Sequence, residues 1–119
     1  KVPLWTDLNE EACDRFAEAG GVAETLDDVM KKAHVVIATT GCSGLISSEM
    51  VRKGSVILAL TNPKPEIEPE VAMQAGASFA ADGKSVNNAL AFPGLFRGAL
   101  NVRATRINNK MKIAAAQCI

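Results

Sequence analysis

The stretch Ser55-Val-Ile-Leu-Ala-Leu-Thr-Asn-Pro-Lys-Pro-Glu66 joins a continuous apolar run to an abrupt polar end at Asn62. An unbroken Val/Ile/Leu run is typical of a strand buried on both faces, as in parallel sheets covered by helices. Such sheets bind ligands in the crevice beyond the carboxyl ends of their strands. Pro63 and Pro65 restrict the backbone of the loop that follows. The stretch therefore predicts a small-molecule site at Asn62.

Further strands and helices are predicted on both sides of this stretch. Apolar runs at 34–39 and 77–81 predict two more strands. Helical spacing is expected from Asp7, after Thr25 and at 69–75. Strands and helices in such short alternation predict an α/β domain with right-handed crossovers.

The beginning and end of the chain add helices to this plan. Asp7 followed by Glu10 resembles a capping box, so the first helix should begin at Asp7. Strand and helix units are expected over about 1–81 and trailing C-terminal helices over about 87–119. Within the latter, Pro93 should either kink a helix or begin a new one.

Composition bounds the class of protein. The 119 residues make one domain or part of one, and 13 basic residues balance 13 acidic ones. This balance argues against nucleic acid or an anionic membrane as the main partner, and the longest apolar stretch is too short to span a bilayer. Three widely spaced cysteines and a single histidine disfavour a zinc site and predict reduced thiols in the cytoplasm.

Three polar clusters follow the three predicted strands. They are Thr39-Thr40-Gly41, Asn62 with Glu66, and the run from Asp82 to Asn88. If the strands are parallel, all three clusters lie at one edge of the sheet and form a shared crevice. The pair Asn87-Asn88 stands at a helix start, where both could be caps or one could present its amide to a ligand. Both alternatives remain open at this point.

Two other patterns in the sequence have plainer explanations than a ligand site. Gly83-Lys84-Ser85 lacks the preceding glycine of a phosphate-binding loop, because Ser78 occupies that position. The alternating acids Glu66, Glu68 and Glu70 could bind a metal. They precede a predicted helix, however, so favourable interactions with its dipole are the better interpretation.

Two long motifs resemble the bacterial-type malic enzymes. The first runs from Leu60 to Ile67 (Leu-Thr-Asn-Pro-Lys-Pro-Glu-Ile), and the second from Val86 to Leu100 (Val-Asn-Asn-Ala-Leu-Ala-Phe-Pro-Gly-Leu-Phe-Arg-Gly-Ala-Leu). The resemblance covers the chain from about Asp27 onward. It departs from the family at 82–86, where many members have a longer loop.

The resemblance implies a fold and an activity. The fold would be the C-terminal part of a Rossmann-type NAD(P)-binding domain, with a parallel sheet flanked by helices. The activity would be that of an oxidoreductase that decarboxylates malate to pyruvate and CO2 while reducing NAD or NADP, with Mg or Mn as the divalent metal. The residue that usually selects between NAD and NADP lies at or before the start of this chain, so the resemblance leaves both open.

The resemblance also assigns residues. Thr39, Thr40 and Gly41 match the turn that lines the dinucleotide. Asn62 matches an asparagine near nicotinamide and substrate, and Asn87 and Asn88 match the pair that contacts malate and the nicotinamide ribose. By this resemblance Asn62 and Asn88 would bind both cofactor and substrate, and Asn87 would bind substrate. No catalytic residue and no metal ligand is assigned.

The family's catalytic tyrosine and lysine, its acidic metal ligands and its glycine-rich fingerprint all precede the region seen here. We therefore expect this chain to work with the remainder of the enzyme, its N-terminal catalytic domain, in a cytoplasmic homo-oligomer. The alternative is a catalytically inactive dinucleotide-binding or assembly module.

Overall fold

The computed structural model describes residues 2–85 and 88–118, with the side chains of 88–90 excepted. The chain forms two compact units, residues 1–85 and residues 86–119, and each is described by itself. The candidate site belongs to the first unit.

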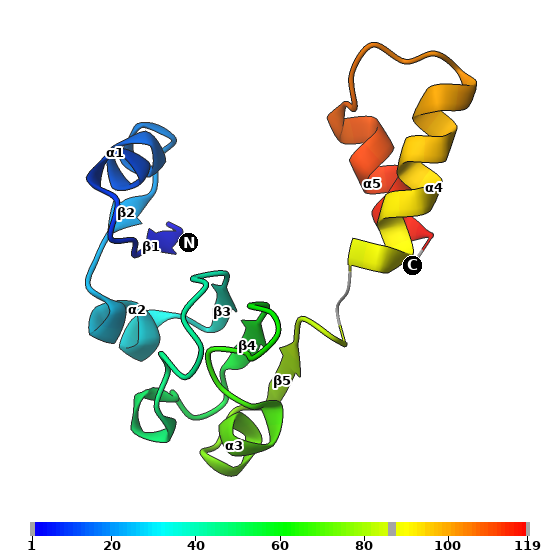
Figure 1. Cartoon of the computed structure of the whole chain (residues 1–119). Helices are drawn as coiled ribbons and strands as arrows, with labels where there is room; N and C mark the ends of the chain where they lie inside the picture. The colour runs from blue at the N-terminus through cyan, green and yellow to red at the C-terminus, as the bar shows by residue number, and fades with distance from the viewer. Residues whose placement is uncertain (1, 86–87, 119) are drawn as a thin grey trace. The chain divides into compact units, whose positions relative to one another are not determined.

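The centre of the first unit is a three-stranded parallel sheet (Figure 1). Its strands are β3 (Val35–Ala38), β4 (Val56–Ala59) and β5 (Phe79–Asp82), in the order β3-β4-β5. The register pairs Ala38 with Ala59, and Ala59 with Asp82. The predicted α/β class and the parallel direction of the strands are confirmed. The third strand lies two residues later at its start, and one residue later at its end, than the sequence predicted.

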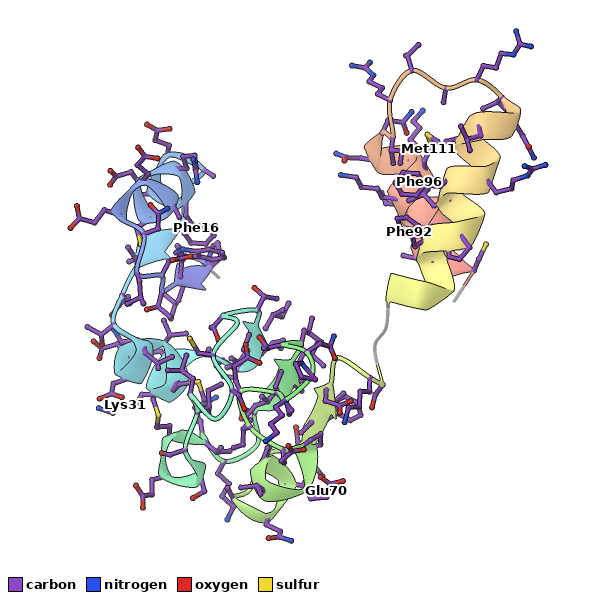
Figure 2. The ribbon with its side chains drawn as sticks, in the orientation of Figure 1. Phe16, Lys31, Glu70, Phe92, Phe96 and Met111 are labelled. Carbon is purple, nitrogen blue, oxygen red and sulfur yellow. The ribbon has the colours of Figure 1, made fainter. Side chains whose placement is uncertain are left out.

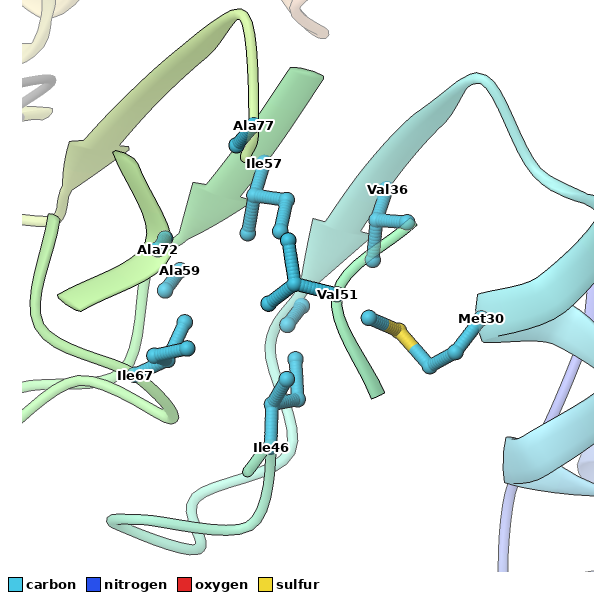
Figure 3. Packing of buried hydrophobic residues seen from close by; sticks show 10 residues of the cluster. Met30, Val36, Ile46, Val51, Ile57, Ala59, Ile67, Ala72 and Ala77 are labelled. Carbon is cyan, nitrogen blue, oxygen red and sulfur yellow. The ribbon is translucent and has the colours of Figure 1, made fainter. Parts of the chain in front are cut away.

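Both crossovers lie on one face of this sheet. The first contains the short 3-10 helix η1 (Ser48–Met50), and the second contains α3 (Pro69–Gln74). Because the strand order advances in one direction, right-handed crossovers return on the same side each time. The buried side chains converge there, as Figure 3 shows for Met30, Val36, Ile57 and Ile67.

The expectation of a sheet buried on both faces is wrong for the described residues. Ile57 is fully buried, but its neighbours Val56 and Leu58 are only half-buried. On the flanking strands, Ile37 is 65% exposed and Phe79 is 53% exposed. The apolar run predicted the strand correctly, while the one-sided placement of both crossovers leaves its second face uncovered by these residues.

A smaller pair of strands precedes the sheet. β1 (Leu4–Trp5) and β2 (Val22–Ala23) pair in parallel around α1 (Glu10–Glu18). Two-residue strands carry too little pattern to be predicted. Figure 2 marks Phe16 on α1, and its ring stacks on Trp5 with centroids 4.9 Å apart.

Of the two helix starts predicted in the first unit, that of α2 is confirmed and that of α1 is wrong. The side chain of Thr25 accepts a hydrogen bond from the amide of Asp28 and begins α2 (Leu26–Lys32), as predicted. The cap of α1, in contrast, is Asn9, which accepts from the amide of Ala12. The expected start at Asp7 is wrong because the Asp7 side chain instead accepts from the Asn9 amide outside the helix.

The second unit is a pair of helices, α4 (Asn88–Asn101) and α5 (Asn109–Gln117). Pro93 lies inside α4 and neither begins nor ends it. Phe92 and Phe96 are one turn apart, with ring centroids separated by 4.5 Å, and Figure 2 labels both. The side chain of Asn108 caps α5 by accepting from the amide of Met111. The trailing helices predicted from the sequence are therefore present.

We predict that Ile57→Ala lowers the free energy of unfolding by about 2–5 kcal/mol, because it leaves a cavity under the central strand. The matched control is Met73→Ala on α3, where the side chain is 47% exposed and the loss should stay below about 0.5 kcal/mol. Denaturant unfolding measures both. Equal losses in the two variants would contradict this placement of the core.

Candidate functional site at the carboxyl ends of the strands

The first two polar clusters and the start of the third, Asp82–Ser85, follow neighbouring strand ends at one edge of the sheet. The register aligns the last residues of β3, β4 and β5, so the loops that follow begin side by side. Thr39, Thr40 and Gly41 follow β3 and are exposed. Asn62 follows β4 and is also exposed, while Asp82 is the last residue of β5.

A single buried carboxylate connects the first two loops. Glu66 has no exposed surface. Its Oε1 accepts from the amide of Thr40 at 2.8 Å, the hydroxyl of Thr40 at 2.9 Å and the hydroxyl of Thr61 at 2.6 Å. Its Oε2 accepts from the amide of Thr61 at 3.3 Å. The carboxylate is therefore hydrogen-bonded to the loops that follow β3 and β4.

The groups around Glu66 favour its ionised form. Two backbone amides can only donate to its oxygens, and two threonine hydroxyls lie within hydrogen-bond distance of Oε1. Burial is the strongest single influence and pushes the pKa of Glu66 upward. The hydrogen bonds from Thr61 and Thr40 together outweigh it and hold that pKa below the ordinary glutamate value.

The role of Glu66 corrects the interpretation of the three alternating acids. Glu70 lies in the first turn of α3, and Glu68 is its N-cap residue, without a side-chain capping bond. Those positions suit a helix-dipole role. Glu66 instead lies in the preceding loop, where Ile67 beside it belongs to the buried cluster. Glu66 is completely buried, whereas Glu68 and Glu70 are exposed.

The hydroxyl groups of Thr40 and Thr61 each donate one hydrogen bond and accept another. The Thr61 hydroxyl donates to Glu66 and accepts from the amide of Gly41 at 2.9 Å. The Thr40 hydroxyl donates to Glu66 and accepts from the amide of Cys42 at 3.1 Å. Further along, the amide of Gly44 donates to the carbonyl oxygen of Pro65 at 3.1 Å. The loops after β3 and β4 are therefore joined along their length.

The loop after β5 contacts Asn62 directly. A Cβ added at Gly83 would lie 2.6 Å from the carbonyl oxygen of Leu60 and 2.8 Å from Nδ2 of Asn62. Real Cβ atoms essentially never approach this closely. Gly83 is therefore required for space, since its φ is not among the positive values. The Asn62–Pro63 peptide bond beside this contact is cis.

Asp82 shapes the same loop. Its Oδ1 accepts from the amide of Lys84 at 3.2 Å, and from the amide and hydroxyl of Ser85 at 2.9 and 2.8 Å. These bonds, led by the Ser85 hydroxyl, lower the pKa of Asp82. Gly83-Lys84-Ser85 is thus a turn closed by a carboxylate. An acid at its centre does not suit a phosphate, which agrees with rejecting the phosphate loop.

A cavity of about 640 Å³ lies within the first unit beside β3. Its lining is mainly apolar, from residues such as Trp5, Ile37 and Leu45, and it includes Thr39 and Thr40. Binding sites for small molecules and cofactors have volumes of about 300–1,000 Å³ and combine apolar walls with a few polar groups. The cavity has the size and chemistry of such a site.

The structure brings together Thr39, Thr40, Gly41 and Asn62 of the predicted site residues. Asn87 lies outside the described residues. Asn88 is the first residue of α4, in the second unit, and its side chain is also outside the described part. The expectations for this pair remain predictions.

Comparison with known proteins shows which enzymes this chain is similar to. The NAD-dependent malic enzyme 1 of Bacillus subtilis is 57% identical over 115 residues, which cover 96% of this chain and 26% of that enzyme. The NADP-dependent malic enzyme of Escherichia coli is 45% identical over 106 residues, covering 80% of this chain and 14% of that enzyme. This chain is homologous to a segment of the malic enzymes. No family model matches it.

Solved malic enzymes share the fold. The NAD-dependent malic enzyme of Thermotoga maritima aligns with a TM-score of 0.76 and 31% identity, over 92% of this chain and 32% of that one. The malic enzyme of Pyrococcus horikoshii aligns with a TM-score of 0.69 and 33% identity, over 93% and 30%. The Rossmann-type α/β fold implied by the resemblance is confirmed. The chain spans about a quarter of the length of the B. subtilis relative.

Two further observations concern metal ions and membranes. Within residues 2–85 and 88–118, no three His, Cys, Asp or Glu side chains are grouped so that they could hold a metal ion. None of the helices in the described part is long and apolar enough to cross a membrane.

The roles of three residues at the site were not predicted from the sequence, although Glu66 and Gly83 lie in two of the polar clusters. Thr61 and Glu66 act through hydrogen bonds between loops, and Gly83 acts by lacking a side chain. The one available signal was that each stands within a few residues of a predicted strand end. That signal marks many loop residues in any protein and does not select these three.

We predict that Gly83→Ala displaces the Asn62 side chain and lowers the free energy of unfolding by about 1–3 kcal/mol, because the new methyl group overlaps Leu60 and Asn62. NMR of the Asn62 side-chain amide, together with denaturant unfolding, makes the measurement. The control is Gly98→Ala on α4, where an added Cβ meets nothing within 4 Å. An unshifted Asn62 amide at unchanged stability would refute the contact.

Proposed function

We propose that this chain forms part of an enzyme that oxidises malate and decarboxylates it to pyruvate and CO2, with reduction of NAD or NADP. The observation that carries the proposal is the 57% identity to a malic enzyme across 96% of the chain. The convergent strand ends supply a place for the chemistry. The relatives named above are enzymes, which favours this function over an inactive binding or assembly module.

The residues at the strand ends suit a dinucleotide. Gly41 has a φ of +73° and open space where a side chain would stand, so a ligand can approach its backbone closely. Thr39 and Thr40 line the neighbouring cavity. We assign these three residues to cofactor binding. When bound, NAD or NADP accepts the hydride that malate loses on oxidation.

Asn62 is assigned to both malate and the nicotinamide. Its amide donates and accepts hydrogen bonds without adding charge, so it can orient a hydroxyl or carboxylate group. The contact with Gly83 limits where that amide can lie. Asn87 is assigned to malate, and Asn88 to malate and the cofactor ribose, on the strength of the family motif.

The metal ion and the proton-transfer residues that this reaction needs are assigned to other parts of the enzyme. Acidic residues elsewhere in the enzyme would hold a divalent Mg or Mn ion, which would supply charge stabilisation for the decarboxylation. The N-terminal catalytic domain would supply these ligands and the proton-transfer residues. We further propose a cytoplasmic homo-oligomer, and its location is supported by the three free thiols at Cys13, Cys42 and Cys118.

In the complete enzyme, we predict that Asn62→Ala lowers kcat/KM for malate by about 10- to 100-fold, equivalent to roughly 1–3 kcal/mol of lost transition-state stabilisation. Steady-state kinetics with NAD and with NADP measure this effect, and the melting temperature reports on folding.

The control is Gln74→Ala, which removes an exposed carboxamide from the end of α3 without touching the strand-end loops. It should leave kcat/KM unchanged. Absence of malate-dependent pyruvate formation by the wild-type enzyme would overturn the proposed function. Full activity in folded Asn62→Ala would remove Asn62 from the site.

A further inference from the structure

We propose that Thr61 and Glu66 are positioning residues for the cofactor-facing loop and for Asn62. Glu66 orients the Thr61 hydroxyl, and that hydroxyl holds the amide of Gly41. The inference deepens the proposed function and rests on it, since it assigns the means by which the dinucleotide-lining turn keeps its shape.

The direction of each hydrogen bond follows from the atoms present. A hydroxyl has one hydrogen, and at Thr61 it points to Oε1 of Glu66 at 2.6 Å. The oxygen lone pairs then face the amide of Gly41 at 2.9 Å. The Thr61 amide also donates to Oε2 of Glu66, at 3.3 Å. Glu66 therefore accepts two hydrogen bonds from Thr61, and the hydroxyl oxygen of Thr61 can still accept one from Gly41.

Gly41 has no side chain to hold it, although its neighbour Thr40 is bonded to Glu66. An added Cβ would find no atom within 4 Å, and the left-handed φ of +73° is a conformation that glycine can leave easily. A hydrogen bond from its amide to Thr61 selects one conformation of the turn. Because NAD or NADP is assigned to this turn, loss of that bond would weaken cofactor binding.

The same two hydrogen bonds between Thr61 and Glu66 fix the start of the loop that carries Asn62. Thr61 directly precedes Asn62, and both the backbone amide and the side chain of Thr61 are bound to the fully buried Glu66. From the other side, Gly83 lies against the Asn62 amide. Asn62 thus extends from a fixed point into a restricted space, although its own side chain is exposed.

Two substitutions at Thr61 separate hydrogen bonding from packing. Thr61→Val keeps the shape of the side chain and removes the hydroxyl, whereas Thr61→Ser keeps the hydroxyl and removes a methyl group. In the complete enzyme, Thr61→Val should raise the KM for the dinucleotide about tenfold, the value of one hydrogen bond of roughly 1.4 kcal/mol. Thr61→Ser should stay within about threefold of wild type.

The opposite order, with serine damaging and valine harmless, would show that Thr61 only packs and would overturn the inference. Wild-type kinetics in both variants would also overturn the inference about Thr61. The proposed function would not be affected by that result. If Thr61→Val does not fold, Thr61→Ala replaces it, because alanine and serine differ only in the hydroxyl.

A second readout holds even if the wild-type enzyme does not oxidise malate, in which case the proposed function fails by itself. Hydrogen exchange of the amide of Gly41 should be faster in Thr61→Val and near wild type in Thr61→Ser. Equal exchange in wild type and both variants would overturn the positioning role.

Discussion

The carboxylate of Glu66 is the group on which the geometry of the strand-end edge depends. It is completely buried, and two hydroxyls and two backbone amides donate to it. Burying a carboxylate is costly unless its oxygens are fully bonded. Here neutral dipoles from the ends of β3 and β4 supply those bonds, so the charge is stable only while the two loops remain together. The loops in turn carry the cofactor-facing turn and Asn62.

This arrangement has a defined dependence on pH. Because the folded-state pKa of Glu66 is lowered, its ionised form stabilises the fold above the pKa that the residue has in the unfolded chain. That contribution is lost as the pH falls through the folded-state pKa. Protonation would leave Oε1 or Oε2 with a hydrogen facing donors. The two loops should therefore be held together less strongly at acid pH.

The strands, a helix cap and the meeting of the strand ends could be predicted from the sequence, and the specific contacts between the loops could not. The apolar runs identified the three strands, Thr25 identified a helix cap, and the polar residues after the strands predicted their meeting at one edge. In contrast, the inward direction of Glu66 and the empty space required at Gly83 depend on residues more than 20 positions away in the chain. The uncovered face of the sheet depends on the common side of two crossovers, which the composition of a strand does not encode.

An NMR titration of the Glu66 side-chain carboxyl carbon in the folded protein is the most direct test of this account, with Glu66→Gln to assign the resonance. The account predicts a pKa below the ordinary glutamate value, and a higher pKa in Thr61→Val, which removes one of the four donors. A pKa at or above the ordinary glutamate value would contradict it, because the carboxylate could not then be the charged anchor of the two loops.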